Sequence, residues 1–113
     1  MRIDIVLFDG FDELDGLAPL EVLQTARGHG ADIEATLVGA YGAATIAADH
    51  GARLVVDRGI SEDADVVLVP GGGWFTRGDH GAWVEVQRGT CRRRSPLLMP
   101  VAPSSPPCAR ARW

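Results

Sequence analysis

The stretch Ile3-Asp4-Ile5-Val6-Leu7-Phe8-Asp9-Gly10 lies at the start of the 113-residue chain and decides its fold. A short, β-branched apolar run that ends at Asp-Gly is typical of a parallel strand with both faces covered. Residues 33–39 alternate like a second strand. Residues 64–69 form another apolar strand, which leads directly into Pro70-Gly71-Gly72-Gly73. These runs predict parallel strands at the centre of the domain.

A helix is predicted between the first two strands, over residues 14–30. Its apolar side chains recur mostly at steps of three and should share one broad face: Leu17, Leu20, Val22, Leu23 and Ala26. Because a proline is tolerated only in the first turn of a helix, Pro19 predicts that this helix begins at residues 15–17. Gly28 and Gly30 provide the stop.

Two shorter features complete the pattern. Residues 44–47 and 53–57, joined through Asp49-His50-Gly51, predict a small β-hairpin. A short helix is expected from residue 79 or 80 to residue 87, after the glycine run. Strand, helix, strand, hairpin, strand, helix is the alternation of a doubly wound α/β sheet.

The composition argues against several classes of protein. The net formal charge is −4 and all 15 acidic residues lie between Asp4 and Glu85, which does not suggest binding to nucleic acid. The apolar runs are too short to cross a bilayer, and the first residues lack the layout of a secretion signal, so we expect a cytoplasmic protein. The three histidines, His29, His50 and His80, have no ligand spacing. We therefore expect no metal site and no cofactor.

Residues 90–113 differ from the rest of the chain. They hold five of the seven prolines, five arginines and no acidic residue, and they show neither helical nor strand periodicity. We therefore divide the chain into a partial α/β domain, residues 1–89, and an irregular Arg/Pro-rich tail, residues 90–113.

The tail can be interpreted as a shifted reading frame. We choose GC-rich codons from Thr90 onward and form each new codon from the third base of one codon and the first two bases of the next. With suitable third bases the tail can then be read as Leu-Pro-Pro-Pro-Leu-Ala-Ala-Ala-His-Ala-Arg-Gly-Ala-Val-Val-Ala-Ser-Val-Cys-Thr-Gly-Ala-Met. This string contains an amphipathic helix, a glycine turn, an apolar strand and a cysteine at a strand-to-helix turn, which is the layout of a nucleophile elbow. We do not expect Cys91 and Cys108, as written, to act as nucleophiles, because no helix N-terminus is predicted beside them.

Three motifs together resemble the ThiJ/PfpI family of the class I glutamine-amidotransferase-like superfamily. They are Val6-Leu7-Phe8-Asp9-Gly10-Phe11, Leu14-Asp15-Gly16-Leu17-Ala18-Pro19-Leu20-Glu21-Val22-Leu23, and Asp65-Val66-Val67-Leu68-Val69-Pro70-Gly71-Gly72-Gly73. The resemblance covers residues 1–89 and implies the N-terminal half of a flavodoxin-like, mostly parallel sheet. Within the superfamily, Asp15 followed by Pro19 is most similar to the isonitrile hydratases, which are lyases, and to the amidase-like domains of transcription regulators.

The resemblance also implies a chemistry. In this family a cysteine thiolate at the elbow is the nucleophile, and a carboxyl group at the start of the first helix hydrogen-bonds its sulfur; Asp15 matches that carboxyl. Gly71 and Gly72 match the backbone that faces the developing anion, with Gly72 the better match for the donor. The implied reaction is the hydration of an isonitrile to an N-substituted formamide, by an intact protein that is a homodimer acting on a small molecule. The chain as written lacks the elbow, so we expect it to be inactive.

Each of these assignments has a structural alternative. Asp15 would also serve as the N-cap of its helix, and the glycine run as a plain turn after a strand. Trp74 and Phe75 would either line a substrate pocket or cover the sheet. For the whole domain, the alternative to an enzyme is a non-catalytic, ligand-sensing domain of a transcription regulator.

Overall fold

The computed structural model describes residues 1–89 and 98–100. In chain order the elements are β1 (Arg2–Leu7), α1 (Glu13–Gly28), β2 (Glu34–Gly39), β3 (Ala44–Ala47), β4 (Arg53–Val56), β5 (Val66–Val69), α2 (Ala82–Arg88) and β6 (Leu98–Pro100). The main sheet has the order β2-β1-β5-β6, and every neighbouring pair in it is parallel. The strands β3 and β4 form a separate antiparallel hairpin. The predicted α/β class, the parallel sheet and the small hairpin are therefore confirmed.

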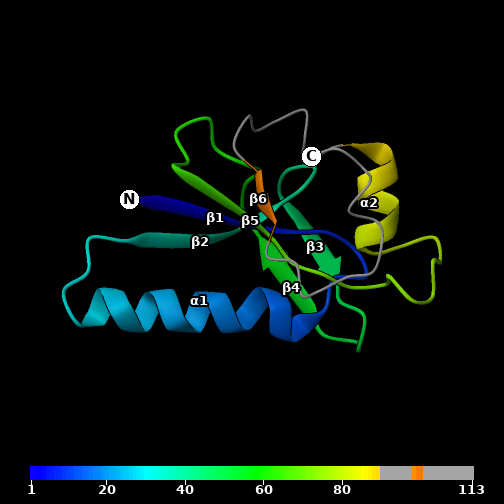
Figure 1. Cartoon of the computed structure of the whole chain (residues 1–113), viewed down its shortest axis with the longest axis horizontal. Helices are drawn as coiled ribbons and strands as arrows, with labels where there is room; N and C mark the ends of the chain where they lie inside the picture. The colour runs from blue at the N-terminus through cyan, green and yellow to red at the C-terminus, as the bar shows by residue number, and fades with distance from the viewer. Residues whose placement is uncertain (90–97, 101–113) are drawn as a thin grey trace.

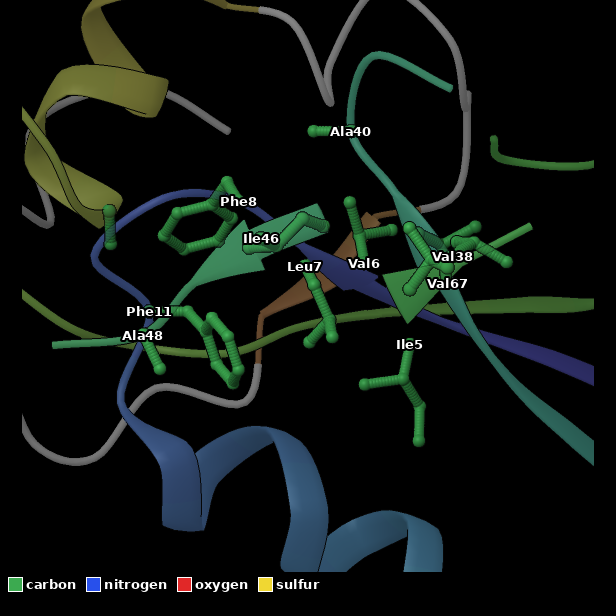
Figure 2. Close-up of a cluster of buried hydrophobic side chains, with 12 residues drawn as sticks. Ile5, Val6, Leu7, Phe8, Phe11, Val38, Ala40, Ile46, Ala48 and Val67 are labelled. Carbon is green, nitrogen blue, oxygen red and sulfur yellow. The ribbon is translucent and has the colours of Figure 1, made fainter. Parts of the chain in front are cut away.

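The central strand β1 organises the core. Every side chain from Ile3 to Phe8 is buried. Because successive strand residues point to opposite faces, Ile5 and Leu7 lie toward α1, whereas Val6 and Phe8 lie on the other side of the sheet, toward α2 (Figure 2). Burial on both faces is why this segment is a continuous apolar run in the sequence.

The two helices cover different parts of the sheet. In Figure 1, α1 runs alongside β1 and β2 in the opposite direction to them, and α2 lies beyond the carboxyl ends of the strands. The close-up in Figure 2 shows α1 below the strands and α2 above them. In the part of the chain that the structure describes, neither helix is long and apolar enough to span a membrane.

Hydrogen bonds from main-chain and carboxylate groups connect the hairpin to the loop between β1 and α1. The Gly10 N–H donates to the Ala47 carbonyl (2.8 Å), and the Ala47 N–H donates to Oδ1 of Asp9 (3.0 Å). One turn later the Asp49 N–H donates to the Phe11 carbonyl (2.9 Å). These bonds fix the course of the chain just before α1 begins.

The predicted start of α1 is wrong. The helix begins at Glu13 because Asp12 caps it, accepting a hydrogen bond from the Leu14 N–H on Oδ1 (3.0 Å). Pro19 consequently lies inside the helix, in its second turn, where it leaves the carbonyl four residues earlier without a helical donor.

The predicted buried face of α1 is also partly wrong. Val22 is 67% exposed and Leu17 also faces solvent, whereas Leu20 and Leu23 pack against the core and Gly16 is buried. The buried stripe therefore follows the spacing of Gly16, Leu20 and Leu23, which sits closer to the helical period than a strict three-residue step.

Two further differences concern the later elements. The helix α2 begins at Ala82, two or three residues after the expected start, because Gly81 adopts a φ of 104° that no helix contains. Leu98–Pro100, within the segment expected to be irregular, forms the strand β6 beside β5. The other residues of the tail, including Cys91 and Cys108, lie outside the described residues.

Candidate functional site

The carboxyl ends of β1 and β5 lie side by side at the point where the strand order of the sheet reverses. From β1 the chain passes to β2 on one side of the sheet and later to β5 on the other. In open α/β sheets such a switch point leaves a crevice beyond the strand ends, and ligands bind there. Residues 8–12 follow β1 and residues 70–73 follow β5, so both loops lie at this point.

Three glycines allow these loops to pack backbone against backbone. Gly10, Gly72 and Gly81 all have positive φ angles, of 81°, 134° and 104°. A Cβ on Gly72 would fall on the Gly10 carbonyl oxygen and 2.6 Å from the Asp12 nitrogen, and a Cβ on Gly81 would lie 2.8 Å from the Gly72 oxygen. We call Gly10, Gly72 and Gly81 the glycine junction. Any side chain larger than hydrogen would separate the loops that meet there.

Two hydrogen bonds tie the junction together. The Gly81 N–H donates to the Asp9 carbonyl, and the Ala82 N–H donates to the Gly72 carbonyl, each at 2.8 Å. The first turn of α2 thus holds the glycine run that follows β5 against the loop that follows β1.

Asp15 lies in the first turn of α1 and reaches the same place. Its Oδ2 accepts a hydrogen bond from the Gly71 N–H at 3.2 Å, in a partly buried setting, and Oδ2 would lie 2.7 Å from a Cβ on Gly71. Asp12, not Asp15, is the N-cap, so the alternative assignment of Asp15 as a cap does not hold. The structure therefore brings together two of the predicted site residues, which are 56 positions apart.

Among the described residues, the Gly72 N–H is a backbone donor at this site that has no hydrogen-bond partner. The Asp12 N–H donates to the Gly71 carbonyl at 2.8 Å and so fixes the plane of the Gly71–Gly72 peptide. Because this peptide is trans, its N–H points opposite to that carbonyl. Within residues 1–89 and 98–100, the Gly72 N–H makes no hydrogen bond, whereas the Gly71 N–H is engaged by Asp15.

The two aromatic residues after the glycine run take different positions. Trp74 packs against the core and meets the Trp83 ring edge-on, with centroids 5.9 Å apart. Arg77 lies over the Trp83 ring, 4.7 Å from its centroid. Phe75 is 98% exposed, so neither the pocket nor the sheet-covering alternative describes it.

A polar cluster that the sequence analysis missed lies nearby, where α2 faces the end of β2. The carboxylate of Glu85, a residue only 6% exposed, accepts a hydrogen bond from the Tyr41 hydroxyl at 2.6 Å and one from Arg88 Nη1 at 3.1 Å. The hydrogen bond to Tyr41 and the charge of Glu85 raise the pKa of Arg88. The spacing of Glu85 and Arg88 on one helix was a signal for their pairing. No sequence signal joins them to Tyr41.

Metal-ligating residues do not gather in the described part of the chain: no group of three or more His, Cys, Asp or Glu side chains there is placed to hold an ion. The site consists instead of the Asp15 carboxylate, the open Gly72 amide and the glycine junction. That set can hydrogen-bond an anionic atom and exchange a proton with it.

A parallel α/β sheet with its site at the switch point defines the flavodoxin-like class of domains. The model of the DJ-1/PfpI family matches residues 1–88, so the chain belongs to this family. No curated protein matches the chain.

Solved structures with the same fold include three relatives. DJ-1beta of Drosophila melanogaster is 24% identical over 63% of this chain, with a TM-score of 0.54. An AraC family transcriptional regulator from Pseudomonas putida is 28% identical over 63%, with a TM-score of 0.54. A DJ-1 superfamily protein from Agrobacterium tumefaciens is 20% identical over 88%, with a TM-score of 0.56. The chain spans 38%, 40% and 52% of the lengths of these proteins, in that order.

Proposed function

We propose that Asp15 and the Gly72 N–H are the proton donor and the anion-binding donor of a cysteine-dependent site in the intact protein. The observation that carries this proposal is the 3.2 Å hydrogen bond between the Gly71 N–H and Asp15 Oδ2, beside an open amide at a switch point. Gly71 acts in the proposal by orienting the carboxylate, because its own N–H is already used.

The reaction that we propose is the hydration of an isonitrile. The cysteine sulfur attacks the terminal isonitrile carbon, and Asp15 protonates that carbon, which gives a thioimidate. Water then adds to the same carbon, the C–S bond breaks, and an N-substituted formamide is released with the thiol restored. The Gly72 N–H would stabilise the negative charge that develops during the addition of water.

We propose that the nucleophile is encoded in the shifted frame. The regrouped tail supplies the apolar run Ala-Val-Val-Ala-Ser-Val, followed by a cysteine that spans codons 108 and 109. The strand β5 accepts a further parallel strand along its outer edge, as β6 demonstrates. A strand ending in cysteine at that edge would deliver the sulfur to the carboxyl end of the sheet, the end at which Asp15 lies. The chain as written would then be inactive.

The test begins with the nucleotide sequence across codons 88–113, read in all three frames. A protein expressed in the restored frame should convert an alkyl isonitrile to its formamide, and the written chain should not. Replacing the restored cysteine by Ala, or making Asp15→Asn, should lower kcat/KM by at least about 100-fold. The matched control is Asp12→Asn, which keeps an efficient N-cap and should leave turnover within a few-fold. Full isonitrile turnover by Asp15→Asn would remove the proton-donor role.

A second candidate function is a ligand-sensing domain. The likeness to an AraC family transcriptional regulator at 28% identity favours it. The two candidates share Asp15 and the glycine junction, and they differ in the segment expected downstream of the domain. A helix-turn-helix segment there in the restored frame, with no isonitrile turnover, would select the regulator. In both versions we propose a small-molecule ligand, a homodimer and a cytoplasmic location for the intact protein.

A further inference from the structure

A cavity of about 320 Å³ lies on the α2 side of the sheet, at the carboxyl ends of β1 and β2. Its walls combine polar side chains with apolar ones, and the apolar ones include Phe8, Ala40 and Ile46, which Figure 2 shows on this side. The cavity shares the loop after β1 with the proposed cysteine site, but Asp15, Gly71 and Gly72 do not line it. Its volume is at the lower end of the range for small-molecule sites.

The cavity contains a guanidinium group that is held in place. Arg88 Nη1 donates to Glu85 Oε1 at 3.1 Å and lies 3.5 Å from the Tyr41 hydroxyl. Glu85 is itself fixed, because its side chain is only 7% exposed and its Oε2 accepts the Tyr41 hydroxyl proton at 2.6 Å. An arginine tethered in this way loses less conformational entropy when it binds a ligand.

The unsatisfied hydrogen-bonding capacity in this cluster belongs to Arg88. Both Glu85 oxygens are engaged, and the Glu85 charge is balanced by the arginine. Among the residues that the structure describes, the Nε and Nη2 groups of Arg88 have no partner, and the side chain is 52% exposed. A guanidinium edge with two free N–H groups matches the two oxygens of a carboxylate.

The charges at the cavity rim narrow the class of ligand. Asp9, another lining residue, is exposed and uses Oδ1 to accept the Ala47 N–H. Its negative charge weakens the binding of any anion here and most strongly disfavours a ligand with a second anionic group. The apolar part of the walls, which includes Phe8, Ala40 and Ile46, favours a ligand that carries a hydrocarbon tail.

We propose that this cavity binds a small monocarboxylate with an apolar tail, whose carboxylate is held by Arg88. Glu85 and Tyr41 act as positioning residues for Arg88. This binding needs no cysteine and no proton donor, so it stands independently of the proposed hydratase function.

The test measures binding to the full 113-residue chain by titration calorimetry, with hexanoate, hexylamine and hexanol as probes. Hexanoate should bind at least about tenfold more tightly than the other two. Arg88→Gln should remove that preference, and Tyr41→Phe, which keeps the ring, should weaken hexanoate binding several-fold. The matched control is Arg77→Gln, which removes an arginine outside the cavity and should leave hexanoate binding unchanged. Equal binding of the three probes, or an unchanged preference for hexanoate in Arg88→Gln, would overturn the proposal.

Discussion

Arg58 donates hydrogen bonds to the carboxylate of Asp4 from both of its terminal nitrogens. Nη2 lies 2.7 Å from Oδ1 and Nη1 lies 3.0 Å from Oδ2. Asp4 is 1% exposed, in the middle of the most buried strand, and its Oδ2 also accepts the Ser61 N–H at 2.8 Å. Arg58, in the segment between β4 and β5, therefore neutralises the charge of Asp4 within the buried strand β1.

Removing Arg58 should destabilise the fold strongly, because it leaves a buried carboxylate without its counter-charge. We expect Arg58→Gln to lower the free energy of unfolding by about 3 kcal/mol. Urea denaturation followed by circular dichroism measures this change. The control is Arg53→Gln on the exposed side of β4, for which we expect a change below about 0.5 kcal/mol. Equal effects of the two substitutions would mean that the Asp4 carboxylate does not need its partner.

Gly72→Ala should disrupt the glycine junction through steric overlap and not only through backbone strain. The new Cβ would meet the Gly10 oxygen and the Asp12 nitrogen, both main-chain atoms that have no room to move. Gly30→Ala is a matched control, because its φ is 97° and nothing lies within 4 Å of its Cβ. We expect about 1 kcal/mol of destabilisation for Gly30→Ala and at least about 2 kcal/mol more for Gly72→Ala. Thermal unfolding of the two variants side by side decides the matter, and similar midpoints would argue against close packing at the junction.

Two glycines of α1 should respond in opposite directions to the same change. Alanine favours a helix over glycine by up to about 1 kcal/mol, so Gly28→Ala, with open space around its Cβ, should stabilise the protein. At Gly16 the Cβ would lie 2.8 Å from Phe11 Cε2 and 3.1 Å from Leu7 Cδ2, both in the buried core. Overpacking of about 1–3 kcal/mol should exceed the gain in helix propensity, so Gly16→Ala should destabilise. Chemical denaturation gives both signs, and stabilisation by Gly16→Ala would contradict the packing of α1 on β1.

The ion pair of Glu13 and His50 should make stability depend on pH. His50 Nδ1 lies 2.9 Å from Glu13 Oε2, and the hydrogen bond and charge of Glu13 raise the pKa of His50 above 6.5. Desolvation raises the pKa of Glu13, but hydrogen bonds from His50 and from backbone N–H groups outweigh it and bring this pKa below 4.5. Protonated His50 therefore stabilises the fold fully below pH 6.5 and loses this effect as the pH rises through its raised pKa. Ionised Glu13 stabilises the fold above pH 4.5 and loses this effect as the pH falls through its lowered pKa.

The contribution of this pair should be greatest between pH 4.5 and pH 6.5. The difference in urea midpoint between the unmodified chain and His50→Gln should be larger at about pH 5.5 than at about pH 8.5. The control is the same substitution made in a Glu13→Gln background, where most of this pH dependence should disappear. A difference between the chain and His50→Gln that stays constant across this range would show that the pair does not act as a charged unit.

The strands could be predicted from the sequence because a buried strand leaves a short apolar run in its own residues. A run such as residues 3–8 is apolar because both of its faces are covered, and a single-chain pattern reports this directly. Pro19 does not mark the start of α1, because the folded chain tolerates the proline inside the helix and Asp12 caps the helix before Glu13. The strand at Leu98–Pro100 could not be read from periodicity, because three residues are too few to show one.

Only the residues of the candidate site that belong to a family-like motif could be predicted from the sequence. Asp15 and the glycine run belong to stretches that resemble a known family, so their convergence was expected. Phe75 was assigned from residue type alone, and its side chain points into solvent. Tyr41 and Glu85 are 44 positions apart, and their contact is set by how α2 docks on the carboxyl end of the sheet, which no local pattern contains.

The glycine junction separates the positioning of main-chain groups from the choice of neighbouring side chains. Its contacts are made by carbonyl oxygens, amide nitrogens and Cα atoms, so substitutions at surrounding positions leave the direction of the Gly72 amide untouched. The residues around a bound molecule can therefore change one at a time without altering the glycine junction. A scaffold of this kind can therefore hold different ligands without any change to its three glycines.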